Sequence, residues 1–142
     1  MTLRAVVNRA LARIFAPPCA ACDATIPRPL DGAVCDACWA ALITFTPPLC
    51  LGCGDPLPAW RQAARADGRC ARCRRRSRPV SRQASVGPYE GTLRAVVHAL
   101  KYDRRRSVAA PLSALMAVAG SELLMDADAV VPVPLHPRRE WA

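Results

Sequence analysis

The sequence has few aromatic residues, almost no lysine and no long apolar run. Aromatic residues make up 5% of the 142 residues, and Lys101 is the single lysine among the 20 basic residues. No stretch approaches the ~20 apolar residues that a membrane-spanning helix needs. Arg4, Arg9 and Arg13 interrupt the first sixteen residues, which argues against an export signal. We therefore expect a cytoplasmic protein whose cysteines stay reduced.

No cysteine lies outside four CxxC pairs. The pairs are Cys19/Cys22, Cys35/Cys38, Cys50/Cys53 and Cys70/Cys73. Two intervening residues let a tight turn aim both thiolates at one metal ion about 2.3 Å away, and two pairs complete a tetrahedron. The sequence therefore predicts two structural zinc ions in a double zinc ribbon of β-hairpins. The simplest assignment joins the first two pairs in one site and the last two in the other, but a crossed pairing stays open.

Disulfide bonding and redox chemistry are alternative uses of the cysteines. An even cysteine count is also typical of secreted, disulfide-bonded domains, whereas redox chemistry needs only one CxxC pair. Four repeated pairs favour zinc over both alternatives. A site closed by four thiolates leaves no position for water, so we expect structural rather than catalytic zinc.

The chain is basic, with a formal net charge of +9. A zinc ion with four thiolates carries minus two, so two filled sites would lower this charge to +5. Such a surface attracts nucleic acids and other anions. The candidate binding residues lie on the last CxxC pair and just after it: Arg72, Arg74, Arg75, Arg76 and Arg78. No aromatic residue interleaves with them, so a solvated linker is the alternative interpretation.

The periodicity of the chain predicts three regions. Residues 1–16 form an amphipathic helix ended by Pro17 and Pro18, and we expect its apolar face to pack on the ribbons or on the following domain. Residues 17–78 form the double zinc ribbon, whose apolar core is too small to fold without metal. Residues 79–142 form a separate domain.

Residues 79–142 show the pattern of an α/β opening. We predict a strand over 82–86, a helix capped by Thr92, a second helix over about 108–125 and a strand over 128–134. Pro111 is tolerated in the first turn of the second helix. His98 has no ligand or carboxylate partner at a suitable interval, so we interpret it as a structural or surface residue.

These motifs resemble the ComF family. The four CxxC pairs precede Tyr-Glu-Gly at 89–91, Leu-Lys-Tyr at 100–102 and Val-Pro-Val-Pro-Leu-His-Pro-Arg-Arg at 131–139. The resemblance implies a double zinc ribbon joined to a phosphoribosyltransferase-like domain, in proteins that help to take up single-stranded DNA. It also implies that Arg138 and Arg139 lie at the edge of a pyrophosphate-binding loop.

The resemblance covers only the first part of the family's phosphoribosyltransferase-like domain. The family continues with Arg-Gly-Phe-Asn-Gln and an acidic Asp-Asp loop that holds phosphoribosyl pyrophosphate at a helix N-terminus, and this sequence contains neither. We expect an incomplete domain without transferase activity, from a truncated gene, a frameshift or a fragment. The alternatives are a zinc-ribbon module that binds single-stranded nucleic acid or a protein of the DNA-uptake machinery, and an active phosphoribosyltransferase.

Overall fold

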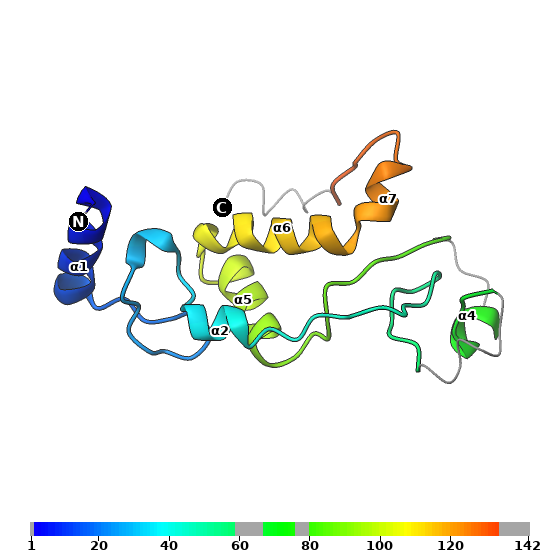
Figure 1. The fold of residues 1–142 in the computed structure, drawn as a ribbon, viewed down its shortest axis with the longest axis horizontal. Helices are drawn as coiled ribbons and strands as arrows, with labels where there is room; N and C mark the ends of the chain where they lie inside the picture. The colour runs from blue at the N-terminus through cyan, green and yellow to red at the C-terminus, as the bar shows by residue number, and fades with distance from the viewer. Residues whose placement is uncertain (1, 59–66, 76–79, 134–142) are drawn as a thin grey trace.

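Short helices follow one another along an elongated molecule. The computed structural model describes residues 2–58, 67–75 and 80–133. Helix α1 (Leu3–Phe15) lies at one end and α4 (Ala71–Arg75) at the other (Figure 1). The remaining elements are η1 (Pro29–Asp31), α2 (Asp36–Ala40), α5 (Gly91–Lys101), η2 (Arg106–Val108), α6 (Ala109–Ala119) and α7 (Ser121–Met125).

No helix in the described ranges is long and apolar enough to span a lipid bilayer.

Helix α1 docks through its polar side. Asn8 is only 4% exposed, and its Oδ1 accepts a hydrogen bond of 2.9 Å from the backbone N–H of Leu30. Arg4 forms an ion pair of 2.8 Å with Asp31 on the same turn. Most of the apolar side chains, Ile14 among them, stay exposed, and Leu11 is half-buried. The expected packing of the apolar face is therefore wrong, because the turn at η1 offers a backbone donor that needs an acceptor when it is buried.

The main core joins the first ribbon to the C-terminal helices. Its buried members are Cys19, Ile26, Ala33, Val34, Cys38, Leu93, Val96, Val108 and Leu112. Val96 of α5 and Val108 of η2 are almost completely buried. The core thus contains residues from both sides of the boundary that we expected between residues 78 and 79.

A second, smaller core surrounds the last two CxxC pairs. It consists of Cys50, Cys53 and Cys73, with Leu57 and Cys70 partly buried against it. It lies at the α4 end of the molecule (Figure 1). The two halves of the zinc ribbon therefore differ in their surroundings, because only the first is part of the main core.

The strands expected at 82–86 and 128–134 are not found among the described residues, which end at 133 in this region. Among the described residues, β-type pairing consists of two isolated bridges in the ribbon region, Pro18 with Thr25 and Leu49 with Pro56. The segment 82–86 runs beside an irregular segment, and the N–H of Phe45 donates to the carbonyl oxygen of Val86 at 2.8 Å. A strand needs a continuous hydrogen-bonded neighbour, and one such bond does not make a sheet.

The helices of the C-terminal region lie close to their predicted positions. Helix α5 begins at Gly91 with Glu90 as its N-cap, so Thr92 lies inside the helix and is not the cap. Pro111 falls in the first turn of α6, as predicted. The single helix expected over 108–125 is interrupted at Gly120, between α6 and α7, because glycine is a poor helix former.

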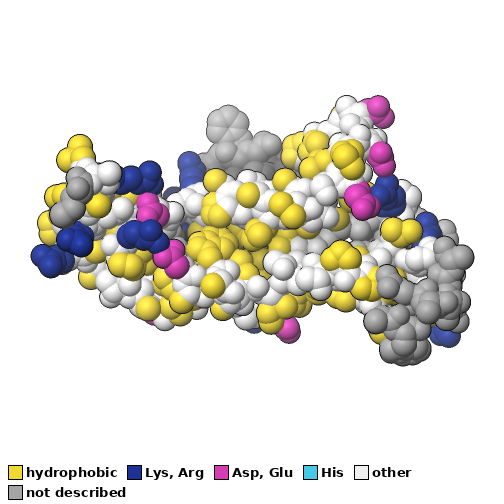
Figure 2. All heavy atoms as spheres, in the orientation of Figure 1, with side chains coloured by type: hydrophobic (Ala, Val, Ile, Leu, Met, Phe, Trp, Pro, Cys, Tyr) yellow, Lys and Arg dark blue, Asp and Glu magenta, His cyan; other side chains and the backbone are white. Residues whose placement is uncertain are grey.

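Much apolar surface of α6 remains exposed. Figure 2 shows hydrophobic side chains across the middle of the viewed face, where α5 and α6 lie. Leu112 is buried in the main core and Leu115 packs against it. Met116 and Val118 are exposed. Within the described residues, α6 is therefore covered on one side only.

Candidate metal centres

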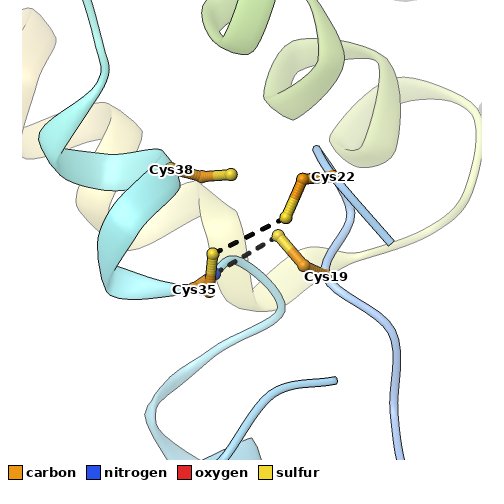
Figure 3. A group of neighbouring side chains, drawn as sticks. All are labelled: Cys19, Cys22, Cys35 and Cys38. Atoms are coloured by element: carbon orange, nitrogen blue, oxygen red, sulfur yellow. Dashed lines mark hydrogen bonds between the residues drawn. The ribbon is translucent and has the colours of Figure 1, made fainter. Parts of the chain in front are cut away.

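The eight cysteines form two groups of four. Within each group the four Sγ atoms lie within 4.8 Å of one another, and the groups follow the chain: Cys19, Cys22, Cys35 and Cys38; then Cys50, Cys53, Cys70 and Cys73. Figure 3 shows the first group, in which the turn at 19–22 faces the start of α2. The structure thus has the sequential pairing and not the crossed one.

Each CxxC pair and the turn that it forms is called a knuckle. The first knuckles of the two groups have the same backbone geometry. The N–H of Cys19 donates to the carbonyl of Ala24 at 2.8 Å, and that of Cys50 donates to Asp55 at 2.8 Å. The N–H four residues after each of these cysteines donates back to the cysteine carbonyl, and that residue has a positive φ in both turns: 58° at Asp23 and 71° at Gly54. The two turns are therefore copies of one knuckle, set 31 positions apart.

The second knuckle of each group opens a short helix. Cys35 is the N-cap of α2, which contains Cys38, and Cys70 directly precedes α4, which contains Cys73. The backbone N–H of Cys35 donates to Cys19 Sγ at 3.4 Å, and that of Cys70 donates to Cys50 Sγ at 3.2 Å. Each helix start therefore presents its N–H to a sulfur of the first knuckle.

The sulfur spacing fits a tetrahedral metal ion. A regular tetrahedron with metal–sulfur bonds of about 2.3 Å has edges of about 3.8 Å. Cys22 and Cys35 place their Sγ atoms 3.8 Å apart, as do Cys53 and Cys70. A disulfide would need about 2.05 Å, and all eight cysteines are free. The donor set of each group therefore fits a closed zinc site.

The thiols of each group ionise unequally. Burial opposes ionisation of Cys19 and Cys50, but backbone N–H donors outweigh it and lower the pKa of each to about 6. Burial, followed by contacts with neighbouring thiols, raises the pKa of Cys38. Burial likewise raises the pKa of Cys53 to about 12. Four adjacent thiolates repel one another, so full ionisation requires a cation, and a dication such as zinc supplies that charge.

The arginine run divides into paired and unpaired residues. Arg72 forms an ion pair with Asp55, and Arg74 forms one of 3.4 Å with Asp67. Arg75 ends α4. Four further arginines proposed from the sequence lie outside the described residues: Arg76, Arg78, Arg138 and Arg139. Anion binding by this run therefore stays a prediction, and Arg72 and Arg74 have structural partners.

Arg72 also supports the second metal centre. Its pKa is raised above the ordinary value, first by a hydrogen bond to Cys53 and then by the charge of Asp55. A guanidinium beside Cys53 favours the thiolate, which is the form that binds zinc. Arg72 thus pairs with Asp55 and favours the ionised form of Cys53.

Replacing Arg72 by alanine should lower the zinc affinity of the second site by about tenfold, because loss of an outer partner commonly costs that much. Competition with a chromophoric chelator would measure this, and the first site should release its zinc as in the unchanged protein. Arg75→Ala on the same helix is the matched control, because Arg75 forms no ion pair with another described residue. Equal affinities in the two variants would contradict a role for Arg72.

One group of neighbouring ring side chains was not predicted from the sequence. The ring of His98 lies 4.9 Å from that of Tyr102 and 6.5 Å from that of Tyr89, between ring centroids. The i,i+4 spacing of His98 and Tyr102 was the available signal, since such residues share a helix face. The contact with Tyr89 depends on the turn before α5 and carries no signal in the spacing.

Comparison with known proteins identifies relatives of the chain. The double zinc ribbon domain family matches residues 10–74. DNA utilization protein YhgH of Salmonella typhimurium is 34% identical over 116 residues, which cover 76% of this chain and 47% of the relative. The protein of the same name from Escherichia coli K12 is 32% identical over the same shares. No solved structure matches the chain.

The chain spans about half the length of the curated relatives it matches. The residues matched by the domain family include all eight cysteines of the two groups. The similarity to the relatives covers 116 residues and is therefore longer than the ribbon itself. The chain belongs to the ComF family and carries its double zinc ribbon, with two groups of four cysteines that fit two structural zinc ions.

Proposed function

We propose that this chain is a ComF-like zinc protein that binds single-stranded DNA in the cytoplasm and serves DNA uptake or utilisation. The observation that carries this proposal is the 116-residue similarity to proteins named for DNA utilization. That similarity extends beyond the ribbon, so it reflects more than the zinc-binding pattern.

The chemistry of the metal centres supports binding rather than catalysis. Each group supplies four sulfurs and leaves no coordination position for water. The zinc ions would hold the knuckles in place, and any contact with a ligand would come from other side chains. A formal charge of +5 with both sites filled favours a polyanion as that ligand.

We further propose that residues 79–142 are the opening of a phosphoribosyltransferase-like domain and that this chain alone does not transfer phosphoribosyl groups. The sequence contains no acidic Asp-Asp loop rich in threonine and glycine. The exposed Met116 and Val118 of α6 support a larger α/β arrangement, in which further structure covers this helix. A protein of the DNA-uptake machinery is the second partner that we propose.

Fluorescence anisotropy with a labelled oligothymidylate tests the proposal. The zinc-loaded chain should bind it at low salt, with an affinity that falls by a log–log slope of about 0.7 per phosphate contact. Binding that is absent at low salt would refute the proposed function. The triple variant Arg74→Ala, Arg75→Ala, Arg76→Ala should reduce the slope if the arginine run contributes.

Calorimetry with phosphoribosyl pyrophosphate tests the second part of the proposal. We expect no saturable heat from the zinc-loaded chain. A stoichiometric binding isotherm would overturn this part and favour an active transferase.

A further inference from the structure

The few ring side chains of this chain are unevenly distributed. They are two tyrosines, two histidines, three tryptophans and two phenylalanines. Both tyrosines and His98 gather along α5, with Tyr89 just before the helix, His98 within it and Tyr102 just after it. Tyr89 is 57% exposed and Tyr102 is 63% exposed. Large rings are usually half-buried or buried, so three adjacent exposed rings need an explanation.

The opposite side of α5 holds the rings in place. Leu93, Val96 and Ala99 are buried, and the first two belong to the main core beside the first metal centre. The N–H of Tyr102 donates to the carbonyl of His98 at 2.8 Å, which continues the helix to its last ring. The ring face is therefore anchored through α5 to the metal-stabilised core.

Basic residues surround this face. Arg94 lies one helical turn before His98, and Lys101 ends the helix. The turn that follows is ordered by a bond of 3.0 Å from the N–H of Arg105 to the carbonyl of Ala99. Its basic side chains are Arg104, Arg105 and Arg106. Glu90 and Asp103 are the acidic residues of the same stretch, so the balance is positive and is concentrated after Tyr102.

We propose that Tyr89, His98 and Tyr102 form a base-stacking platform for single-stranded DNA, with the phosphates lying over Lys101 and the basic turn at 104–106. This inference rests on the proposed function and names the site that performs it. Rings beside cationic side chains are the combination that binds single strands without sequence preference. Lys101, Arg105 and Arg106 form no ion pair with another described residue, so their charges are available to phosphates.

The arginine run after the last CxxC pair fits this role less well. Arg72 and Arg74 are paired with Asp55 and Asp67, and no described ring lies beside them. A single strand bound there would gain charge contacts but no stacking. The α5 face supplies both.

Anisotropy with a labelled oligothymidylate and an abasic oligomer of equal length tests the platform. The double variant Tyr89→Ala, Tyr102→Ala should bind oligothymidylate about tenfold more weakly or worse, because stacking on each ring contributes substantially. Its affinity should approach that of the unchanged protein for the abasic strand, with the salt slope unaltered. Lys101→Ala should instead lower the salt slope by about 0.7.

Three controls separate stacking from folding. Tyr102→Phe keeps a ring and should keep most of the affinity. Phe15→Ala removes an exposed ring from α1, at the end of the molecule, and should leave binding unchanged. Two bound zinc ions in each variant would show that the metal centres are intact.

The outcomes distinguish this inference from the proposed function. If the unchanged protein binds oligothymidylate but the double tyrosine variant binds equally well, the platform is refuted and single-strand binding stands. Equal affinity of the unchanged protein for abasic and normal strands would also refute the platform. If the unchanged protein binds no single strand at low salt, both proposals fail.

Discussion

Replacing Cys38 by serine should remove one zinc ion and unfold α5 and α6, whereas replacing Cys53 should remove the other zinc ion and leave these helices folded. The two cysteines are matched in burial, at 8% and 5% exposed. They occupy different cores. Cys38 packs in the cluster that contains Leu93, Val96 and Leu112, and Cys53 packs in the separate cluster of the second site.

The size of this effect follows from the energetics of small metal-bound domains. Structural zinc contributes about 10–16 kcal/mol of apparent binding free energy in zinc-finger peptides, while a whole domain is stable by about 5–15 kcal/mol. Loss of one thiolate therefore removes enough free energy to unfold whatever depends on that site. At the first site this includes α5 and η2, because Val96 and Val108 complete the same core.

Hydrogen exchange with mass spectrometry, combined with zinc analysis, would check this prediction. Both variants should bind one zinc ion, but only Cys38→Ser should lose amide protection in α5 and α6. Loss of protection in both variants would show that the ribbon folds as one unit. Retained protection in Cys38→Ser would show that the C-terminal helices do not depend on the first metal centre.

The metal centres were predictable because their determinants are local. A CxxC pair specifies its own turn, and four such pairs can be joined into two sites in only three ways. The structure chooses the sequential pairing through contacts that the spacing does not encode, such as the N–H of Cys35 directed at Cys19. The helices at 91–101 and 109–119 were predictable for a similar reason, since apolar periodicity acts within a few turns.

The errors concern features that depend on distant residues. The segment 82–86 has the composition of a strand, but its neighbour is the irregular stretch around Phe45, which the local pattern does not reveal. Asn8 lies on the polar side of α1, which an amphipathic pattern predicts to face solvent. It is buried because Leu30, 22 positions away, presents a backbone N–H to it. Periodicity identifies a helix but not which of its faces finds a partner.

Replacing Gly87 by alanine should destabilise the protein by roughly 2 kcal/mol or more, as forced overpacking commonly does. A Cβ at Gly87 would lie 2.2 Å from the carbonyl oxygen of Ile43. That oxygen belongs to the backbone and cannot rotate away. Beside this contact, the N–H of Phe45 donates a hydrogen bond to the carbonyl oxygen of Val86. We expect the substitution to break this hydrogen bond and to separate the segment around residues 43–45 from the segment around residues 86–87.

Gly91→Ala is the matched control for Gly87→Ala. Gly91 has a φ of +48°, but no atom outside its chain neighbours and the backbone of its own helix lies within 4 Å of its Cβ position, so alanine there costs only about 1–2 kcal/mol of backbone strain. Chemical denaturation of the zinc-loaded variants would compare the two costs. Gly87→Ala should be the less stable variant and should lose exchange protection at the amide of Phe45. If Gly91→Ala is equally or more destabilising, the close contact between the backbones of residues 43 and 87 is not what makes glycine necessary at position 87.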